Sequence, residues 1–124
     1  MKIPDNYQTV MPYLIVEGAQ KFIEFAKAVF NAKETYNMAR SEGVIMHAEI
    51  MIGGSTIMFA DATQQFAART AGMFVYVENA DETYEKALAN GATSIMPPAD
   101  QSYGRSCGIV DPFGNMWWPT TPGN

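Results

Sequence analysis

The sequence predicts an α+β protein built from two β-α-β-β-β modules. Three observations support this fold class. First, a shift of 61 residues aligns VEGAQKFIEFAKA, which starts at Val16, with VENADETYEKALA, which starts at Val77. Second, each copy follows a β-like run of apolar residues and itself has helical spacing. Third, the segments that follow the helical stretches alternate apolar and polar residues with the period of a strand.

The size and composition of the chain indicate one globular domain over residues 1–124. The chain has 124 residues, of which 48% are apolar and 17% are charged. This length suffices for a hydrophobic core without stabilising metal ions or disulfide bonds. The formal net charge is −5, and the eight basic residues are scattered. Because phosphate binding needs clustered Lys and Arg, we expect neither a nucleic acid nor a membrane surface as a partner.

The first module begins with the run MPYLIV at residues 11–16, which predicts a strand. The following helix is expected to start at Gly18 and to end near Asn31, since both residues are acceptable at those positions. Phe22, Ala26 and Phe30 lie at helical spacing and predict its apolar face.

Two strands and a hairpin are predicted next. In residues 44–52 the even-numbered residues share one face of an extended segment, and Ile45, His47, Glu49 and Met51 share the other. Gly53-Gly54 signals a tight turn, and STIMFAD, at residues 55–61, returns as the partner strand. Module one therefore spans about residues 7–61.

Module two spans about residues 72–120. GMFVYV predicts a strand, and a helix follows in which Asn79 caps the start and Gly91 closes the end. Three more strands are predicted in ATSIM, GRSCGIV and NMWWPT. Pro97-Pro98 and residues 111–114 are expected to be the turns between them.

The doubled unit, together with VIMHAEIMIGGSTIMFAD in the first half and YGRSCGIVDPFGNMWW in the second, resembles the vicinal oxygen chelate superfamily and its PhnB-like branch. That superfamily includes glyoxalase I, extradiol dioxygenases, and fosfomycin- and bleomycin-resistance proteins. The resemblance implies cupped mixed sheets around a cavity for a small organic ligand, and it implies a homodimer.

The resemblance also implies where a catalytic member would hold a divalent metal ion. Carried onto this sequence, the four ligand positions fall at Met11, Met58, Trp118 and near Gly72. None of these residue types holds such an ion well. The resemblance therefore predicts no metal and no other cofactor at the usual site, and it predicts a cavity lined by methionine and aromatic groups.

The predicted ligand-binding residues form two groups. Apolar contact is expected from Met11, Tyr13, Met58 and Trp118, with Trp117 on the opposite face of its strand. Tyr103 and Arg105 are placed at the entrance, where a guanidinium holds a carboxylate or phosphate well. The alternatives are a surface tyrosine and a solvated loop arginine.

A rival hypothesis is that the protein is an enzyme. His47 is the only histidine, and Glu49 lies two residues on, so both side chains project from one face of a strand. The pair suits acid–base work or an irregular metal site. The alternative is a half-buried, hydrogen-bonded histidine with Glu49 at a rim.

These observations favour a binding protein that takes up a small organic molecule for resistance or sequestration. The alternative is a metal-dependent lyase, isomerase or dioxygenase of the same superfamily that uses His47 and Glu49. A third hypothesis is a structural module whose aromatic surface is a protein interface. The single Cys107 fits a reducing cytoplasm, where we expect the protein to reside.

Overall fold

The structure is a computed structural model of the chain, and it describes residues 1–123. The chain divides into two compact units. The first comprises Met1–Lys27 and Asn31–Thr70, and the second comprises Ala28–Phe30 and the chain from Ala71 onward.

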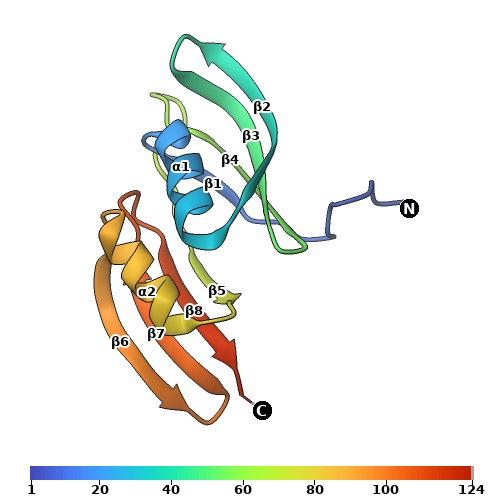
Figure 1. Cartoon of the computed structure of the whole chain (residues 1–124). Coiled ribbons are helices and arrows are strands. Elements are labelled where there is room, and N and C mark those ends of the chain that lie inside the picture. Colours follow the sequence, from blue (N-terminus) through green and yellow to red (C-terminus); the bar gives the residue numbers. More distant parts are fainter. Residues whose placement is uncertain (124) are drawn as a thin grey trace. The chain divides into compact units, whose positions relative to one another are not determined.

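The first unit contains one helix and a mixed four-stranded sheet (Figure 1). Its elements are β1 (Tyr13–Val16), α1 (Ala19–Phe30), β2 (Lys33–Ser41), β3 (Val44–Ile52) and β4 (Ser55–Asp61). The strand order is β1-β4-β3-β2, with β1 parallel to β4 and the other neighbours antiparallel. The last turn of α1 belongs to the second unit.

The second unit repeats this arrangement. Its elements are β5 (Gly72–Tyr76), α2 (Ala80–Ala89), β6 (Thr93–Gln101), β7 (Gly104–Val110) and β8 (Met116–Pro122). The order β5-β8-β7-β6 has the same parallel outer pair, β5 with β8, and the same antiparallel neighbours. The predicted α+β fold of two β-α-β-β-β modules is therefore confirmed. No helix among residues 1–123 is long and apolar enough to cross a membrane.

The two helices begin in matching ways, which is the structural counterpart of the internal repeat. Gly18 precedes α1 and has no side chain to cap it, so the Asp61 carboxylate from the end of β4 accepts the backbone N–H groups of Gly18 and Ala19. In the second unit the Thr121 hydroxyl, near the end of β8, accepts the N–H of Ala80 at 2.8 Å. A last-strand oxygen thus serves each helix start, where backbone donors have no partner within the helix.

The helix ends agree with the sequence prediction. The Asn79 side chain accepts the N–H of Glu82 at the start of α2, as the capping pattern predicts. Asn31 ends α1 in the left-handed conformation with φ +56°, and Gly91 follows α2 with φ +96°.

One predicted turn is wrong. Pro97-Pro98 lies inside β6 instead of separating two strands. The reason is the position of β6 at the edge of its sheet, where a strand tolerates residues that have no backbone N–H to donate. The pairing with β7 is irregular between Met96 and Ala99, so the prolines occupy a bulged stretch of the edge.

Strand pairing and burial separate two faces in each sheet. The helix face of the first sheet carries Leu14, Ala48 and Phe59, which are all buried, and the Phe22 ring of α1 meets Phe59 edge-on at 4.9 Å. We call the other side the open face, because the module's own helix does not cover it. By strand alternation the open face carries Tyr13, whose register partner on β4 is Met58.

The second sheet has the same two faces. Its helix face carries Cys107, Ile109 and Trp117, which are at most 1% exposed, and the Cys107 thiol lies beside Ala80 of α2. Its open face carries Phe74 and Trp118, which are register partners on β5 and β8. Phe74 therefore occupies the position that Tyr13 holds in the first sheet.

Trp117 and the turn before β8 are held by one buried carboxylate. Asp111 is 4% exposed, and its Oδ1 accepts the backbone N–H groups of Phe113 and Asn115, both at 2.9 Å. Its Oδ2 accepts the Asn115 amide and the Trp117 indole N–H, again at 2.9 Å. The segment DPFGN therefore does more than turn the chain, because it fixes which indole faces the core.

Candidate functional site

The open face of the first sheet carries a chain of four polar side chains. The Tyr7 hydroxyl donates to Glu49 Oε1 at 2.6 Å, and Glu49 Oε2 lies 2.7 Å from His47 Nε2. The other ring nitrogen, His47 Nδ1, lies 2.9 Å from the Tyr13 hydroxyl. The predicted pair of His47 and Glu49 is thus a bonded pair with a tyrosine at each end.

The elements of the fold explain this arrangement. His47 and Glu49 are two residues apart in β3 and share its open face, while β4 places Met58 beside Glu49 and also beside Tyr13 of β1. The Tyr13 ring stacks on the His47 ring, with centroids 5.4 Å apart and an interplanar angle of 29°. Tyr36 of β2 approaches the same imidazole at 5.8 Å.

Burial increases toward the carboxylate. Glu49 is only 6% exposed, whereas Tyr13 is 49% exposed. Hydrogen bonding to Glu49, followed by burial and the carboxylate's negative charge, raises the pKa of the Tyr7 hydroxyl above its ordinary value. Within residues 1–123, every buried side-chain nitrogen or oxygen has a hydrogen-bond partner. The carboxylate is therefore a satisfied anchor, and Tyr13 is the accessible end of the chain.

A small cavity opens on the carboxylate side of this chain. Its volume is about 180 Å³, which is below the several hundred Å³ of most ligand pockets. The cavity accommodates a few atoms of a ligand and not a whole drug-sized molecule. It is lined by Asp5, Asn6, Tyr7, Thr35, Tyr36, Glu49, Met51 and Thr56.

The open face of the second sheet is aromatic. A methyl group added at Gly108 would overlap the six-membered ring of Trp118, so this indole lies directly against the β7 backbone where no side chain intervenes. Phe74 is 51% exposed, and its ring contacts Tyr76 at 5.1 Å and Tyr103 at 6.3 Å between centroids. The rings of Phe74, Tyr76 and Tyr103 form an apolar surface, and the Trp118 indole lies next to Phe74 in the sheet.

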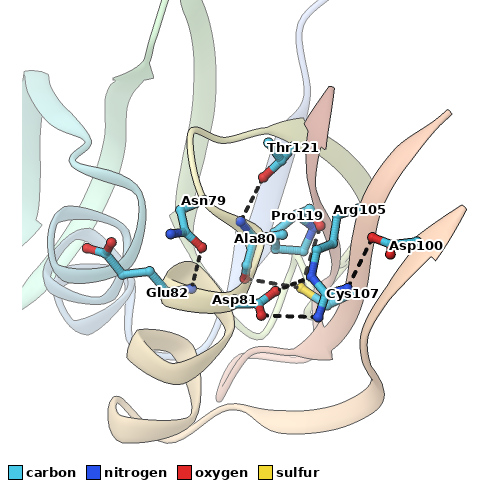
Figure 2. Close-up of polar contacts among 9 residues, drawn as sticks. All are labelled: Asn79, Ala80, Asp81, Glu82, Asp100, Arg105, Cys107, Pro119 and Thr121. Atoms are coloured by element: carbon cyan, nitrogen blue, oxygen red, sulfur yellow. Dashed lines mark hydrogen bonds and ion pairs between the residues drawn. The ribbon is translucent and has the colours of Figure 1, made fainter. Parts of the chain in front are cut away.

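Arg105 is placed on the other face of this sheet, next to α2 (Figure 2). Its Nε and Nη2 donate to the two carboxylate oxygens of Asp81 at 2.6 and 3.1 Å, and Nη1 donates to Asp100 at 3.1 Å. The hydrogen bonds from Arg105 hold the pKa of the Asp81 carboxyl below its ordinary value. The guanidinium thus ties the first turn of α2 to β6 and β7.

Cys107 lies beneath the same helix start. It is fully buried, and its thiol points at the carbonyl oxygens of Ala80 and Pro119 (Figure 2). Burial, with a smaller contribution from the charge of Asp81, raises the pKa of the Cys107 thiol to about 11. At neutral pH the group is a thiol and not a nucleophilic thiolate.

The structure brings some of the predicted site residues together and separates others. Tyr13, Met58, His47 and Glu49 meet on the open face of the first sheet. Met11 is half-buried and precedes β1. In the second unit Trp118 and Tyr103 both have Phe74 as a neighbour, while Arg105 lies on the helix face. The ligand-binding roles of all these residues stay predictions.

Two participants were missed by sequence reasoning. Tyr7 lies before the first strand and Tyr36 lies on an edge strand that is exposed along its whole length. Neither position belongs to a periodic pattern, so the sequence carried no signal for either one. Only the pairing of β2 with β3, which sets Tyr36 opposite Glu49, reveals the contact.

The donor set does not fit the metal ion that the fold family implies. Among residues 1–123, no three His, Cys, Asp or Glu side chains gather where they could hold an ion. The predicted pair His47 and Glu49 has its facing nitrogen and oxygen bonded to each other. A metal needs those same lone pairs and at least one further ligand.

Comparison with known proteins agrees with the fold. The family described as the Glyoxalase/Bleomycin resistance protein/Dioxygenase superfamily matches residues 7–118. The chain belongs to this superfamily. An uncharacterized protein of Mycobacterium bovis is 30% identical to the chain in an alignment of 118 positions, and the alignment covers 86% of this chain and 78% of that protein.

Solved structures of the superfamily have the same fold as this chain. A PhnB protein from Bacillus cereus superposes with a TM-score of 0.71 at 20% identity, covering 92% of this chain and 99% of the other. TnmS3, an antibiotic binding protein from Streptomyces sp. CB03234, superposes with a TM-score of 0.73 at 15% identity, covering 99% of each chain.

Proposed function

We propose that this superfamily member binds a small, largely planar organic molecule on the open faces of its sheets, for resistance or sequestration, and that it does so without a metal ion. The observation that carries the proposal is the filling of corresponding open-face positions by Tyr13 with Met58 and by Phe74 with Trp118. Sulfur and aromatic groups adapt to an apolar ring and are poor ligands for a hard ion.

Two further observations support binding. Tyr76 and Tyr103 are 65% and 53% exposed beside Phe74, so large aromatic surfaces remain available to a ligand. TnmS3, which has the same fold, is itself described as an antibiotic binding protein. A mainly apolar surface with a few fixed polar groups is the usual composition of a small-molecule site, and Tyr13 with His47 supplies such groups here.

The proposal is tested by titrating a panel of planar aromatic and amphipathic compounds while tryptophan emission is recorded. Saturable quenching is expected, and it should disappear in Trp118→Phe because Trp117 is buried. For the open face of the first sheet, calorimetry with any panel compound that binds there should show weaker binding by Met58→Ala. Met46→Ala is the matched control, since Met46 neighbours His47 in β3 but points to the other face. Absence of saturable quenching across the panel would count against the proposal.

Acid–base catalysis is the second candidate function. It is favoured by the 2.7 Å bond between Glu49 Oε2 and His47 Nε2, which is the arrangement that orients a catalytic imidazole. A metal-dependent lyase, isomerase or dioxygenase would instead need a coordinated ion. Elemental analysis of protein purified without chelator separates the two, because a stoichiometric transition metal lost in His47→Ala would support the metal enzyme.

We also propose a cytoplasmic homodimer, as the resemblance to the superfamily implies. Light scattering behind a sizing column gives the mass directly. Replacing Trp118 by Ala should leave the dimer intact if the indole lines a ligand site. If the aromatic surface is a protein interface, the same change should yield monomers.

A further inference from the structure

The donors and acceptors in the row of hydrogen-bonded side chains on the first open face can be assigned from its buried end, the Glu49 carboxylate. An ionised carboxylate only accepts hydrogen bonds, so Glu49 takes one from the Tyr7 hydroxyl at Oε1 and one from His47 at Oε2. The proton of a neutral His47 therefore sits on Nε2. Its Nδ1 is then the acceptor, and the Tyr13 hydroxyl must donate to it across 2.9 Å.

This assignment decides what Tyr13 offers to a ligand. A hydroxyl has one hydrogen, and here that hydrogen is already directed at His47. Because Tyr13 is 49% exposed, its hydroxyl oxygen offers only its lone pairs to a ligand. A ligand group at this point must be a hydrogen-bond donor, and an acceptor such as an ether or a carbonyl oxygen finds no proton there.

We propose that the open face of the first sheet selects a planar ligand with an acidic hydroxyl group, a phenol or an enol, and takes up its proton through Tyr13 and His47. The inference rests on the proposed binding function and names the ligand class for the same face. Tyr13 supplies the contact atom, Met58 lies beside it on β4, and the Tyr36 ring lies beside His47. His47 is the proton acceptor and Glu49 is its positioning residue.

The proton that the ligand loses is fully accounted for by Tyr13 and His47. The ligand O–H bond breaks and its proton passes to the Tyr13 oxygen, while the Tyr13 proton passes to His47 Nδ1. The ligand becomes an anion and His47 becomes an imidazolium. The two hydrogen bonds between His47 and the ligand then run toward the ligand, from His47 Nδ1–H to the Tyr13 oxygen and from the Tyr13 hydroxyl to the ligand oxygen, while His47 Nε2–H still donates to Glu49. No oxidant, reductant or other reactant is required.

The groups that face His47 and its carboxylate partner come from three strands and from the segment before β1. Glu49, from the same strand, faces Nε2 at 2.7 Å with a carboxylate that is 6% exposed, and a carboxylate behind an imidazole stabilises the imidazolium. Tyr13 from β1 and Tyr36 from β2 bring their rings within 5.4 and 5.8 Å, where an aromatic ring attracts a cation. Tyr7, from the segment before β1, reaches the far oxygen of the carboxylate and not the ring.

The experiment uses the full chain and two matched probes. 4-Nitrophenol absorbs in the visible range only as its anion, and 4-nitroanisole is its methyl ether, which has no acidic hydrogen. Slightly below neutral pH, where most of the free phenol is un-ionised, binding of 4-nitrophenol should increase the anion band. The phenol should bind at least about tenfold more tightly than the ether, a difference of about 1.4 kcal/mol.

Variants and a direct observation of the imidazole complete the test. Tyr13→Phe and His47→Gln should each abolish the increase in the anion band, whereas Tyr84→Phe, which removes an exposed helix hydroxyl bonded to Ser94, should preserve it. Because His47 is the only histidine, the ring nitrogen spectrum of labelled protein reports this side chain alone. It should show the Nε2–H form in the free protein and the imidazolium with 4-nitrophenol bound.

The outcomes separate this inference from the binding function on which it rests. Equal affinities for phenol and ether without any increase in the anion band would overturn the proton uptake and leave ligand binding in place. An Nδ1–H imidazole in the free protein would also overturn it. If neither probe binds and the wider panel also fails to quench Trp118, both the inference and the proposed function fall.

Discussion

Replacing Asp111 by Asn should destabilise the protein strongly, although the Asp and Asn side chains are similar in size. The carboxylate has two oxygens that together accept four N–H groups, from Phe113, Asn115 and the indole of Trp117. An amide keeps one oxygen and turns the other into a donor, so two N–H groups face an NH₂ group in a site that is 4% exposed. Each orphaned buried donor costs about 1–3 kcal/mol, which gives a loss of about 4 kcal/mol.

Urea unfolding followed by tryptophan emission measures this loss. A decrease of about 4 kcal/mol in the free energy of unfolding corresponds to roughly 15 °C in Tm for a chain of this length. Asp100→Asn is the matched control, because the Asp100 side chain is 86% exposed and the change should stay within about 0.5 kcal/mol. If Asp111→Asn also costs less than about 1 kcal/mol, the assignment of Asp111 as the organiser of this turn is wrong.

Three further outcomes follow from the contacts. Asp61→Ala removes three backbone hydrogen bonds, two of which cap the start of α1, and should lower the free energy of unfolding by about 3 kcal/mol in the same assay. A loss below about 1 kcal/mol would refute this capping role. Gly108→Ala should cost about 2 kcal/mol and shift the Trp118 emission, because the added methyl group displaces that ring; an unchanged spectrum would contradict the packing. In Arg105→Gln, carboxyl NMR should show the pKa of Asp81 rising toward its ordinary value of about 3.9, since its main hydrogen-bond donor is lost. In the unchanged protein the Asp81–Arg105 pair stabilises the fold fully above the ordinary pKa of Asp81. This stabilisation disappears as the pH falls through the lower pKa that Asp81 has in the folded protein.

Much of the fold could be predicted because the repeat and the apolar periodicity coincide. The Asn79 cap, the Gly53-Gly54 hairpin and the faces of β3 all depend on neighbours within a few residues, and the structure agrees with each of them. The edge strands were harder to predict from the sequence. β2 is exposed along its whole length and has no buried face to produce a period, and β6 contains prolines that a central strand would exclude.

The site was partly predictable for a related reason. His47 and Glu49 are two residues apart in one strand, so alternation alone places them on one face. The partners at either end of the pair, Tyr7 and Tyr13, come from 34 or more residues away and depend on how the strands pair. Arg105 shows the opposite case, because a glycine-flanked arginine predicts an entrance loop, whereas its strand register turns it toward Asp81.

Direct observation of the two neighbouring indoles tests the central claim for the second sheet, that its open face binds a planar ligand. In protein labelled with fluorotryptophan, Trp117 and Trp118 give one resonance each, and Trp117 is the internal reference because it is buried and bonded to Asp111. On saturation with a ligand from the planar aromatic panel, the Trp118 resonance should move and the Trp117 resonance should stay in place. A stationary Trp118 resonance, or equal movement of both, would contradict the claim.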